Sequence, residues 1–370
     1  MSPINPFKYG RVVSGRDFFG REDLIAQLAE HMESSQNVVL HGDRRVGKTS
    51  LIHEMVRRKK LTLLYVDFMS VRSEDDMCRR ILREVIALEN ASGFLKKIMA
   101  TLAHLRPVLS VDPITMAPEI KLDASLRLGS SSISETIALI ASLHGEKPKL
   151  AVAFDEFQDI GRLPAASEIY ALMRSKIQFH EMIPYIFAGS NQHKLDMVFT
   201  SPDSPFFKSA IPLSVGPFPR EEFMSFIIKK FKLGQRVINK ASLTAIFDTC
   251  RDVPGDVQQF CEAVWSVSAG KGIISEKTIA EALNLIFTRE RGTYEYITAN
   301  LTDVQARCLF ALARIGGSSV FSQAFSKESG NLIATNQRAV EMLLKKGIIY
   351  ENRGAYEFIS PFFKHWIKIN

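Results

Sequence analysis

A glycine-containing motif at residues 42–49 limits the possible folds of this chain more than any other feature of its sequence. Residues 42–49 are Gly-Asp-Arg-Arg-Val-Gly-Lys-Thr, which matches the pattern GxxxxGK followed by Ser or Thr. The apolar segment 37–41 precedes the motif and the amphipathic segment 50–58 follows it, so we expect a loop that joins a buried strand to a helix. Glycines let backbone N–H groups surround a phosphate, and a helix N-terminus favours negative charge. The pattern therefore predicts an ATP site at residues 42–50.

Two side chains at the end of the loop have expected chemical roles. Lys48 should reach the β- and γ-phosphates and act in catalysis, and the Thr49 hydroxyl should bind Mg²⁺. The residues that we expect to contact the nucleotide are Gly42, Asp43, Arg44, Arg45, Val46, Gly47, Lys48, Thr49 and Ser50.

A pair of carboxylates follows a second apolar strand further along the chain. The segment 149–156 (KLAVAFDE) ends in Asp155 and Glu156, which should lie at the carboxyl edge of the sheet beside the phosphate loop. We expect Asp155 to hold Mg²⁺ through water, and Glu156 to orient and deprotonate the attacking water. The alternative is a strand followed by a solvated acidic turn.

Polar residues also follow the next apolar strand, 184–188 (PYIFA). Ser190 and Asn191 are candidates for a hydrogen bond to the γ-phosphate or to the attacking water, and we prefer Ser190. An ordinary turn with helix capping is the alternative.

Further nucleotide contacts are expected from two turns. In the segment 18–23 (FFGRED), Phe19 would pack beside the adenine while Arg21 and Glu22 fix the loop, although a short helix with an N-terminal turn is an equal alternative. Pro254 starts a new helix after the segment 251–253, and the first N–H groups of that helix would face the nucleotide. Arg174 is the best-placed candidate for an arginine that senses charge, with a surface ion pair as the alternative.

The order of apolar and helical segments indicates several domains. Strands are predicted at 37–41, 61–68, 149–154, 184–188 and 210–215, where Pro212 should weaken the last strand or place it at an edge. Helices are predicted at 50–58, at 74–88 and from Ser134. We expect an ATPase core at 1–216 with a hairpin insertion at about 90–147 (strands within 107–122), a helical lid at 217–290 with a break near 291–300, and a winged helix-turn-helix at 291–370.

The last 70 residues have the pattern of a winged helix. Helices are predicted at 302–315, 321–326 and 336–346, followed by strands at 348–350 and 356–359. The helix that begins at Asn336-Gln337-Arg338 would enter a DNA major groove, and Lys345, Lys346 and Arg353 would contact phosphates. Winged helices also serve as protein-contact modules, so both functions stay open.

Composition adds only broad limits. Hydrophobic residues make up 46% and charged residues 24% of the chain, a balance typical of globular proteins. No apolar run reaches about 18 residues, the N-terminus lacks the apolar core of a secretory signal, and the four cysteines form no CxxC pair. We therefore expect a cytoplasmic protein without a membrane partner. A net charge of +7 is compatible with a nucleic acid or an acidic partner but does not require one.

The motifs FFGRED, GDRRVGKTS, KLAVAFDEFQD, FAGSNQ, VPGDVQ and ISPFFKHWI together resemble a predicted ATPase family found mainly in Archaea. That family belongs to the STAND class, which is close to AAA+ ATPases such as the origin-recognition proteins. The resemblance implies an α/β fold with a five-stranded parallel sheet of order 5-1-4-3-2, a helical lid and a C-terminal winged helix. Two departures are an absent arginine finger in 200–208 and an absent second sensor arginine, for which Arg251 is only a weak candidate. Both put obligate ring assembly in doubt.

We expect an ATP-binding, slowly hydrolysing switch that uses ATP and Mg²⁺ and couples nucleotide state to the position of the winged helix. Its partner would be a protein, and the chain would be a monomer or a nucleotide-dependent oligomer. The alternative is a DNA-binding AAA+-type ATPase, similar to origin-recognition, loader or transposition ATPases, with its winged helix on duplex DNA. A nucleotide-binding scaffold with a silent active site is a third possibility.

Overall fold

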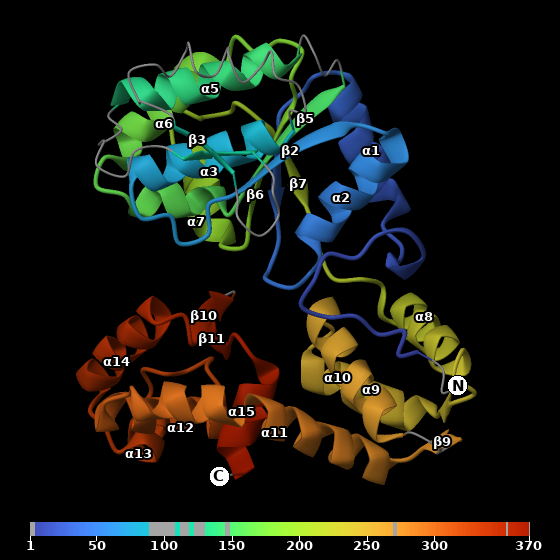
Figure 1. Cartoon of the computed structure of the whole chain (residues 1–370). Coiled ribbons are helices and arrows are strands. Elements are labelled where there is room, and N and C mark those ends of the chain that lie inside the picture. The colour runs from blue at the N-terminus through green and yellow to red at the C-terminus, as the bar shows by residue number, and fades with distance from the viewer. Residues whose placement is uncertain are drawn as a thin grey trace. The chain divides into compact units, whose positions relative to one another are not determined.

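The chain folds into two compact units. In the computed structural model one unit is Val12–Gly216, and the other combines Met1–Arg11 with Pro217–Asn370. Figure 1 shows the helices and strands of both. The structure describes residues 4–88, 108–111, 118–121, 130–144, 149–268, 272–352 and 354–369.

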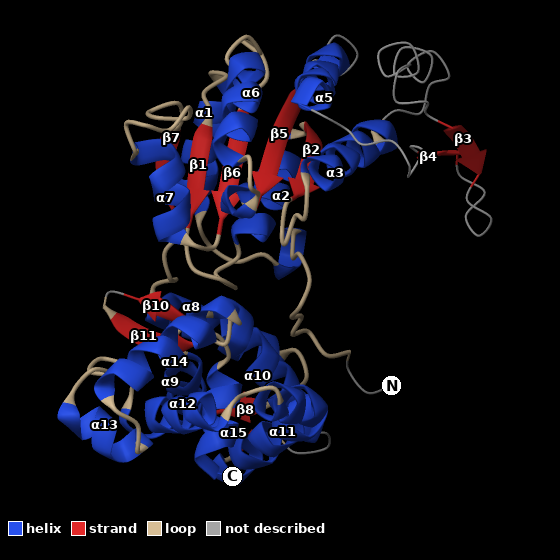
Figure 2. Cartoon of the chain, turned by 90° about the vertical axis from the view of Figure 1, so that its left-hand side faces the viewer, coloured by secondary structure: helices blue, strands red, loops and turns tan. Residues whose placement is uncertain are grey.

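A five-stranded parallel sheet forms the centre of the first unit. Its strands are ordered β2-β5-β6-β1-β7, and Figure 2 shows them side by side with helices around them. Numbered along the chain, this order is 5-1-4-3-2, so the predicted sheet is confirmed. The strands are β1 (Val38–His41), β2 (Thr62–Asp67), β5 (Leu150–Asp155), β6 (Tyr185–Gly189) and β7 (Ile211–Ser214).

Alternation along the central strands explains why both faces of the sheet are buried. In β5, Leu150, Val152 and Phe154 contribute to one core cluster, whereas Ala151 and Ala153 contribute to another. Successive side chains of a strand point to opposite faces, so the two clusters lie on the two sides of the sheet. The first cluster includes residues of α3, α5, α6 and α7, and the second includes residues of α1 and α2. A parallel sheet covered on both faces is the usual arrangement in α/β proteins.

The helices predicted at 50–58 and 74–88 are confirmed as α2 and α3, whereas the third predicted helix differs at its start. The sequence predicts a helix from Ser134, but α5 begins at Ser130. Ile133, Ile137 and Ile140 are fully buried in the first core cluster, so their packing extends the helix back into the serine run. The helical segments are η1 (Gly15–Asp17), α1 (Glu22–Glu33), α2 (Lys48–Lys59), α3 (Glu74–Ala87), α5 (Ser130–His144), η3 (Phe157–Arg162), α6 (Ala166–Ile177) and α7 (Gln192–Thr200).

Two expectations for strands in this unit are confirmed. Strand β7 lies at the edge of the sheet, where Pro212, which has no backbone N–H to donate, pairs in register with Val39. Within the insertion, β3 (Val108–Val111) and β4 (Pro118–Lys121) pair antiparallel. Of the predicted insertion at about 90–147, residues 90–107, 112–117 with the predicted turn, 122–129 and 145–148 lie outside the described residues.

The second unit begins with helices that pack on the N-terminal segment of the chain. The Phe7 ring lies 4.6 Å from the Phe231 ring and 6.1 Å from the Trp265 ring. The region is not helical throughout, because β8 and β9 form a short parallel pair. The elements are α8 (Arg220–Lys232), β8 (Val237–Ile238), α9 (Lys240–Cys250), α10 (Pro254–Val267), β9 (Ile273–Ile274) and α11 (Glu276–Ala299).

Helix α11 continues through most of the range 291–300, in which the sequence predicts a break. It passes through Gly292 and ends at Ala299, and a capping box formed by Ser275 and Thr278 fixes its start. The helix is 24 residues long, yet in the described part of the chain no helix combines the length and apolar character needed to cross a membrane.

The C-terminal elements form the predicted three helices and hairpin, with three corrections. Helix α13 spans Gln323–Ser329 rather than 321–326. Helix α14 begins at Ile333 rather than Asn336, because Leu332 has the extended backbone of an N-cap and ends the preceding loop there. A further helix, α15, follows the hairpin and buries Phe362, Phe363 and Ile367. The elements are α12 (Asp303–Ile315), α13 (Gln323–Ser329), α14 (Ile333–Lys345), β10 (Ile349–Asn352), β11 (Ala355–Phe358) and α15 (Pro361–Ile369).

Candidate functional site

The phosphate loop lies between β1 and α2, and its backbone needs glycine at two positions. A Cβ atom at Gly42 would lie 2.4 Å from the carbonyl oxygen of Val215, which is closer than any Cβ contact allows. Gly47 caps α2 with a φ of +96°, a conformation that side chains disfavour. Arg45 also has a positive φ of 64°. The loop is therefore held in one curved path that leads directly into the N-terminus of α2.

Lys48 curls back over the loop that precedes it. Its Nζ donates to the carbonyl oxygen of Gly42 at 2.7 Å and to that of Asp43 at 3.0 Å. Burial lowers the pKa of Lys48, although the nearby Glu156 and Asp155 act in the opposite direction. The ammonium group thus lies inside the loop, next to both acidic residues.

Thr49 and Asp155 meet at the carboxyl edge of the sheet, as the sequence predicts. The Thr49 hydroxyl donates to Asp155 Oδ2 at 2.8 Å. The Tyr65 hydroxyl donates to the same oxygen at 2.6 Å. Burial raises the pKa of Tyr65 well above its usual value, and the neighbouring Asp155 adds to the effect. A hydroxyl and a carboxylate side by side are hard oxygen donors of the kind that Mg²⁺ prefers, so these residues fit that ion.

Glu156 turns away from the strand immediately after Asp155. Its φ of +48° places it in the left-handed region, directly before η3. Its Oε2 accepts hydrogen bonds from the Ser190 hydroxyl at 2.8 Å and from Gln158 Nε2 at 2.6 Å. A positive φ at a residue other than glycine carries a strain that is often found at functional sites. The structure therefore brings Glu156 and Ser190 together.

Ser190 and Asn191 separate in the structure. The Ser190 hydroxyl contacts Glu156 and also accepts from Arg44 Nε at 3.3 Å, so it links the phosphate loop to the acidic pair. Asn191 caps α7, with its side-chain oxygen accepting from the backbone N–H of Lys194 at 3.0 Å. Helix capping was the alternative to a sensor role for these two residues, and of the two only Asn191 makes a capping contact.

The segment before α1 is fastened to the phosphate loop. The Arg21 guanidinium donates to the carbonyl oxygens of Val46 and Gly216, each at 2.9 Å, and burial lowers its pKa to about 10. Glu22 pairs with Arg58 of α2. Phe19 is half-buried, and its expected contact with adenine stays a prediction.

Two further contacts hold the start of the first unit on α2. Glu54 is fully buried and accepts from the backbone N–H of Gly15 at 2.8 Å, as well as from Arg57 and Arg58. The hydroxyl of Ser50, a predicted nucleotide contact, accepts from the backbone N–H of Val13 at 3.1 Å.

Sequence reasoning missed Tyr65, Gln158 and Glu54. A polar residue within an apolar strand was the available signal for Tyr65, but only the strand order brings β2 beside β5. Gln158 lies two residues beyond Glu156, and its contact depends on the turn into η3. Glu54 has the sequence pattern of an exposed helical residue and gave no signal.

Other predicted residues lie elsewhere. Pro254 starts α10 in the second unit, and its expected nucleotide contact stays a prediction. Arg251 contacts the hairpin instead, pairing with Glu357 and donating to the Phe358 carbonyl oxygen at 2.9 Å. Arg174 is half-buried on α6, and its sensor role stays a prediction.

The proposed DNA-contacting residues of α14 divide between core and surface. Asn336 is fully buried, where it accepts from Asn331 Nδ2 at 3.1 Å and donates to the Ser329 hydroxyl at 3.0 Å. It therefore belongs to the core and is not available to a groove. Gln337 and Arg338 are exposed. Arg353 lies outside the described residues.

Family models match two parts of the chain. Residues 17–183 match the family model described as "AAA ATPase domain", and residues 292–369 match the model described as "Probable winged helix domain". No curated protein matches the chain.

Similar solved structures span almost the whole chain. A Walker-type ATPase of Pyrococcus abyssi has 19% identity and a TM-score of 0.66, with 97% of this chain and 99% of that chain covered. The ORC2 protein of Aeropyrum pernix in its ADP form has 14% identity, a TM-score of 0.53 and coverage of 98% and 95%. The ORC1 protein of Aeropyrum pernix in complex with DNA has 11% identity, a TM-score of 0.50 and coverage of 95% and 93%. At these identities the likeness concerns the fold.

Proposed function

We propose that this chain, an AAA+-related P-loop ATPase with a C-terminal winged helix domain, works as a slowly hydrolysing ATP switch. The observation that carries this proposal is the convergence of Lys48, Thr49, Asp155 and Glu156 at one edge of the sheet. A phosphate loop, a site for Mg²⁺ and a base for water are the parts that ATP hydrolysis needs.

Nucleotide binding would replace contacts that the loop now makes with itself. Lys48 would exchange the carbonyl oxygens of Gly42 and Asp43 for phosphate oxygens. The N–H groups of residues 43–50 would surround the β-phosphate. Thr49 and Asp155 would hold Mg²⁺, which neutralises charge on the phosphates when bound. Phe19 and Pro254 are proposed to contact the base.

Glu156 is proposed to be the base for hydrolysis. The oxygen of water would bond to the γ-phosphorus as the bond between that phosphorus and the bridging oxygen of ADP breaks. Glu156 would accept the water proton, and Ser190 would keep its carboxylate in place.

The same unit holds the proposed lid and the winged helix, which supports the switch. Arg251 of the lid pairs with Glu357 and the Phe358 carbonyl oxygen, and the Phe260 and Phe362 rings meet edge to face at 5.7 Å. A lid that responds to nucleotide would therefore carry the winged helix with it. The predicted boundaries 1–216, 217–290 and 291–370, membership of the STAND class and a cytoplasmic location remain proposals.

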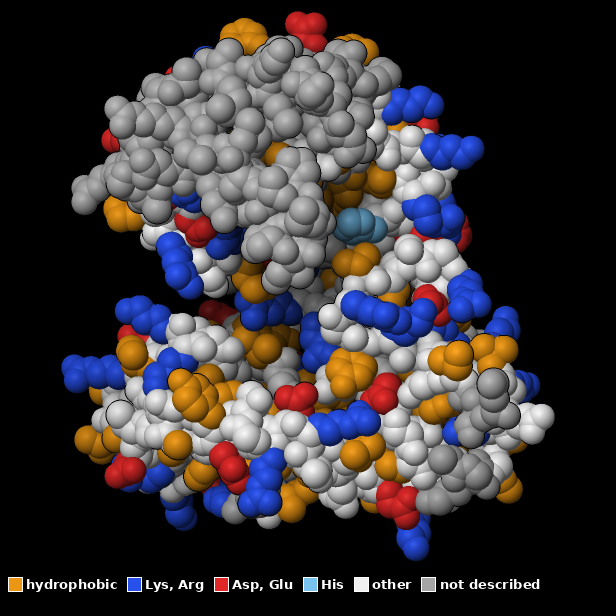
Figure 3. All heavy atoms as spheres, viewed as in Figure 1, with side chains coloured by type: hydrophobic (Ala, Val, Ile, Leu, Met, Phe, Trp, Pro, Cys, Tyr) orange, Lys and Arg blue, Asp and Glu red, His pale blue; other side chains and the backbone are white. Residues whose placement is uncertain are grey.

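Exposed apolar side chains near both ends of α14 support a protein partner. Leu332, which precedes the helix, is 77% exposed, and Ile333 and Met342 are 42% and 40% exposed, while Gln337 and Arg338 between them are exposed polar residues. On the face shown in Figure 3, basic, acidic and apolar side chains are mixed in the described part of the second unit. Exposed apolar side chains on an output helix suit a protein surface better than phosphates.

DNA binding is the second candidate function. The winged helix fold supports it, as does the overall fold shared with an ORC1 protein whose structure was solved in complex with DNA. Titration of a fluorescent duplex at increasing salt, with and without ATP, tests it. Affinity that falls steeply with salt would support phosphate contacts, and no binding at low salt would remove this candidate.

Two substitutions test the ATPase itself. Lys48→Ala is expected to abolish nucleotide binding, whereas Glu156→Gln should retain binding and lose turnover. Fluorescent-nucleotide titration and phosphate release measure the two quantities. Wild-type turnover in Glu156→Gln would contradict the assignment of the base, and absence of turnover in the wild type would favour a silent scaffold. Size-exclusion chromatography of Glu156→Gln with ATP would show whether it stays a monomer.

A further inference from the structure

Gln158 contacts the proposed base from a position two residues further along the chain. The left-handed turn at Glu156 starts η3 and returns the chain, so that Gln158 Nε2 lies 2.6 Å from Glu156 Oε2. Gln158 is only 4% exposed. Its donor therefore reaches the same oxygen that the Ser190 hydroxyl reaches from the end of β6.

Gly189 provides the space for this amide. A Cβ atom at Gly189 would lie 2.0 Å from Gln158 Oε1 and 3.1 Å from its Cδ. Gly189 directly precedes Ser190, so one short segment supplies both a donor to Glu156 and room for the second donor. Two segments that are distant in the sequence thus close on one carboxylate oxygen.

The unpaired oxygen of the Gln158 side-chain amide lowers the stability of the fold, which suggests a functional reason for the presence of the amide. Among the described residues, Gln158 Oε1 has no hydrogen-bond donor, although it is buried. Burial of an unpaired polar group usually lowers stability. An apolar side chain of the same size would pack here without that cost. Sites that give up local stability in this way are often functional.

We propose that Gln158 is a positioning residue for ATP hydrolysis. Together with Ser190 it fixes the Glu156 carboxylate through Oε2 and leaves Oε1 to accept the proton of the attacking water. This inference rests on the proposed function, in which Glu156 is the base. Gln158 itself does not touch the nucleotide in this scheme and acts only through Glu156.

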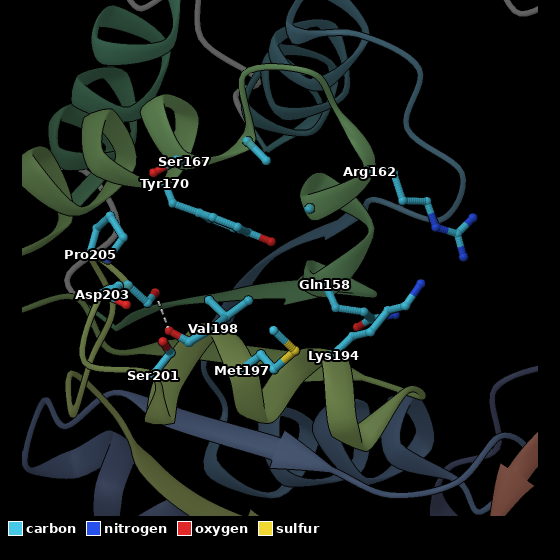
Figure 4. A pocket seen from close by; sticks show the side chains of 13 residues that line it. Gln158, Arg162, Ser167, Tyr170, Lys194, Met197, Val198, Ser201, Asp203 and Pro205 are labelled. Atoms are coloured by element: carbon cyan, nitrogen blue, oxygen red, sulfur yellow. Dashed lines mark hydrogen bonds between the residues drawn. The ribbon is translucent and has the colours of Figure 1, made fainter.

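Gln158 also lines a cavity, and the choice of a test substitution has to take this cavity into account. Gln158 lines a cavity of about 420 Å³ between η3, α6 and α7, which Tyr170 and Val198 also line (Figure 4). Gln158→Ala would open this cavity towards Glu156 and admit water. Gln158→Met keeps the unbranched shape and volume but removes the donor, so it is the sharper variant.

The expected result is a change in turnover without a change in binding. Gln158→Met should lower kcat about 10- to 100-fold, because a small displacement of a catalytic group costs this much. Its Kd for a fluorescent ATP analogue should stay within about twofold of the wild-type value. Its melting temperature should change little, because the variant loses an unpaired buried oxygen but also a donor to the buried Glu156 carboxylate. All three quantities are measured on the full-length protein. Phosphate release under single-turnover conditions gives the turnover rate, fluorescence titration gives Kd, and thermal unfolding gives the melting temperature.

A control and a second variant make the test independent of folding. Tyr170→Phe removes one hydroxyl from the same cavity without touching Glu156 and should keep the wild-type kcat. Gly189→Ala removes no polar group but displaces the Gln158 amide, so it should lower kcat as Gln158→Met does. If Gln158→Met does not fold, Gly189→Ala gives the answer.

Full turnover in Gln158→Met, or an equal loss of nucleotide binding and turnover, would overturn the proposal. Glu156→Gln separates this outcome from a failure of the proposed function. If Glu156→Gln is inactive and Gln158→Met is fully active, only the positioning role is wrong. If Glu156→Gln is as active as the wild type, the assignment of the base is wrong and the inference falls with it.

Discussion

Buried polar groups serve different purposes in the two units of this protein. In the first unit they converge on one edge of the sheet, where Thr49 and Tyr65 contact Asp155, and Ser190 and Gln158 contact Glu156. In the second unit Asn336 lies among Asn331 and Ser329 inside the winged helix, away from the exposed face of α14.

The two networks differ in whether their polar groups remain available to bind a ligand. The carboxylates of the first unit carry negative charge beside Lys48 and at the end of parallel strands, where ligands commonly bind. The amides of the second unit are neutral and contact one another, so they specify the packing of α13 on α14. A polar motif on a helix therefore indicates a binding surface only after its face is known.

The largest expected effect comes from the first network. Asp155→Asn should lower ATP turnover by about 100-fold or more, because it removes the charge proposed to hold Mg²⁺. The matched control is Asp67→Asn, at the position in register with Asp155 on β2, which should retain turnover. Phosphate release at several Mg²⁺ concentrations measures both. Equal losses in the two variants would show that negative charge at the sheet edge, and not Asp155 itself, is required.

The second prediction concerns the buried carboxylate of Glu54, which stabilises the first unit. Contacts with Arg57, Gly15 and Arg58 lower the pKa of Glu54 to about 2. Its folded pKa is below its unfolded value, so its stabilisation is complete above about pH 4.5 and is lost as pH falls towards 2. Glu54→Gln should cost about 2–3 kcal/mol at pH 7 and should flatten the stability profile in that window. Urea unfolding from pH 7 to pH 3 measures this, and a profile with unchanged slope would contradict it.

Asn336 tests the neutral network of the second unit. Asn336→Ala should lower stability by about 1–3 kcal/mol, because it leaves Asn331 and Ser329 without their buried partner. Gln337→Ala, one residue further along on the exposed side, should change stability by less than about 0.5 kcal/mol. Thermal unfolding compares the two variants. A larger effect for Gln337 would mean that the assignment of the helix faces is wrong.

The smallest effect is expected at the contact between the proposed lid and the winged helix. Arg251→Ala removes its contacts with Glu357 and the Phe358 carbonyl oxygen, which should cost about 1 kcal/mol or less because both side chains are partly exposed. Nucleotide affinity should not change. Limited proteolysis should cut the variant more readily between residues 291 and 302. Identical proteolysis of the variant and the wild type would argue against a mechanical link at Arg251.

Much of the first unit could be predicted because its signals are local. Strand-loop-helix geometry at 37–58, the apolar strand before Asp155 and the proline at the edge of β7 depend on residues that are close in sequence. The start of α5 was missed because burial of Ile133 outweighs the preferences of the serines around it. Helix α14 was placed three residues late for a similar reason, since its start depends on tertiary packing and not on the polar residues near Asn336.

The sequence by itself determined the phosphate loop, because the pattern at residues 42–49 joins a strand to a helix whatever surrounds it. It also placed Asp155 and Glu156 at the end of a buried strand. Only the tertiary structure brought Tyr65 to Asp155, closed Gln158 and Ser190 on Glu156, and turned Asn336 into the core. The physical reason is that a hydrogen bond between residues distant in sequence depends on strand order and on the direction of a turn, neither of which a local pattern contains.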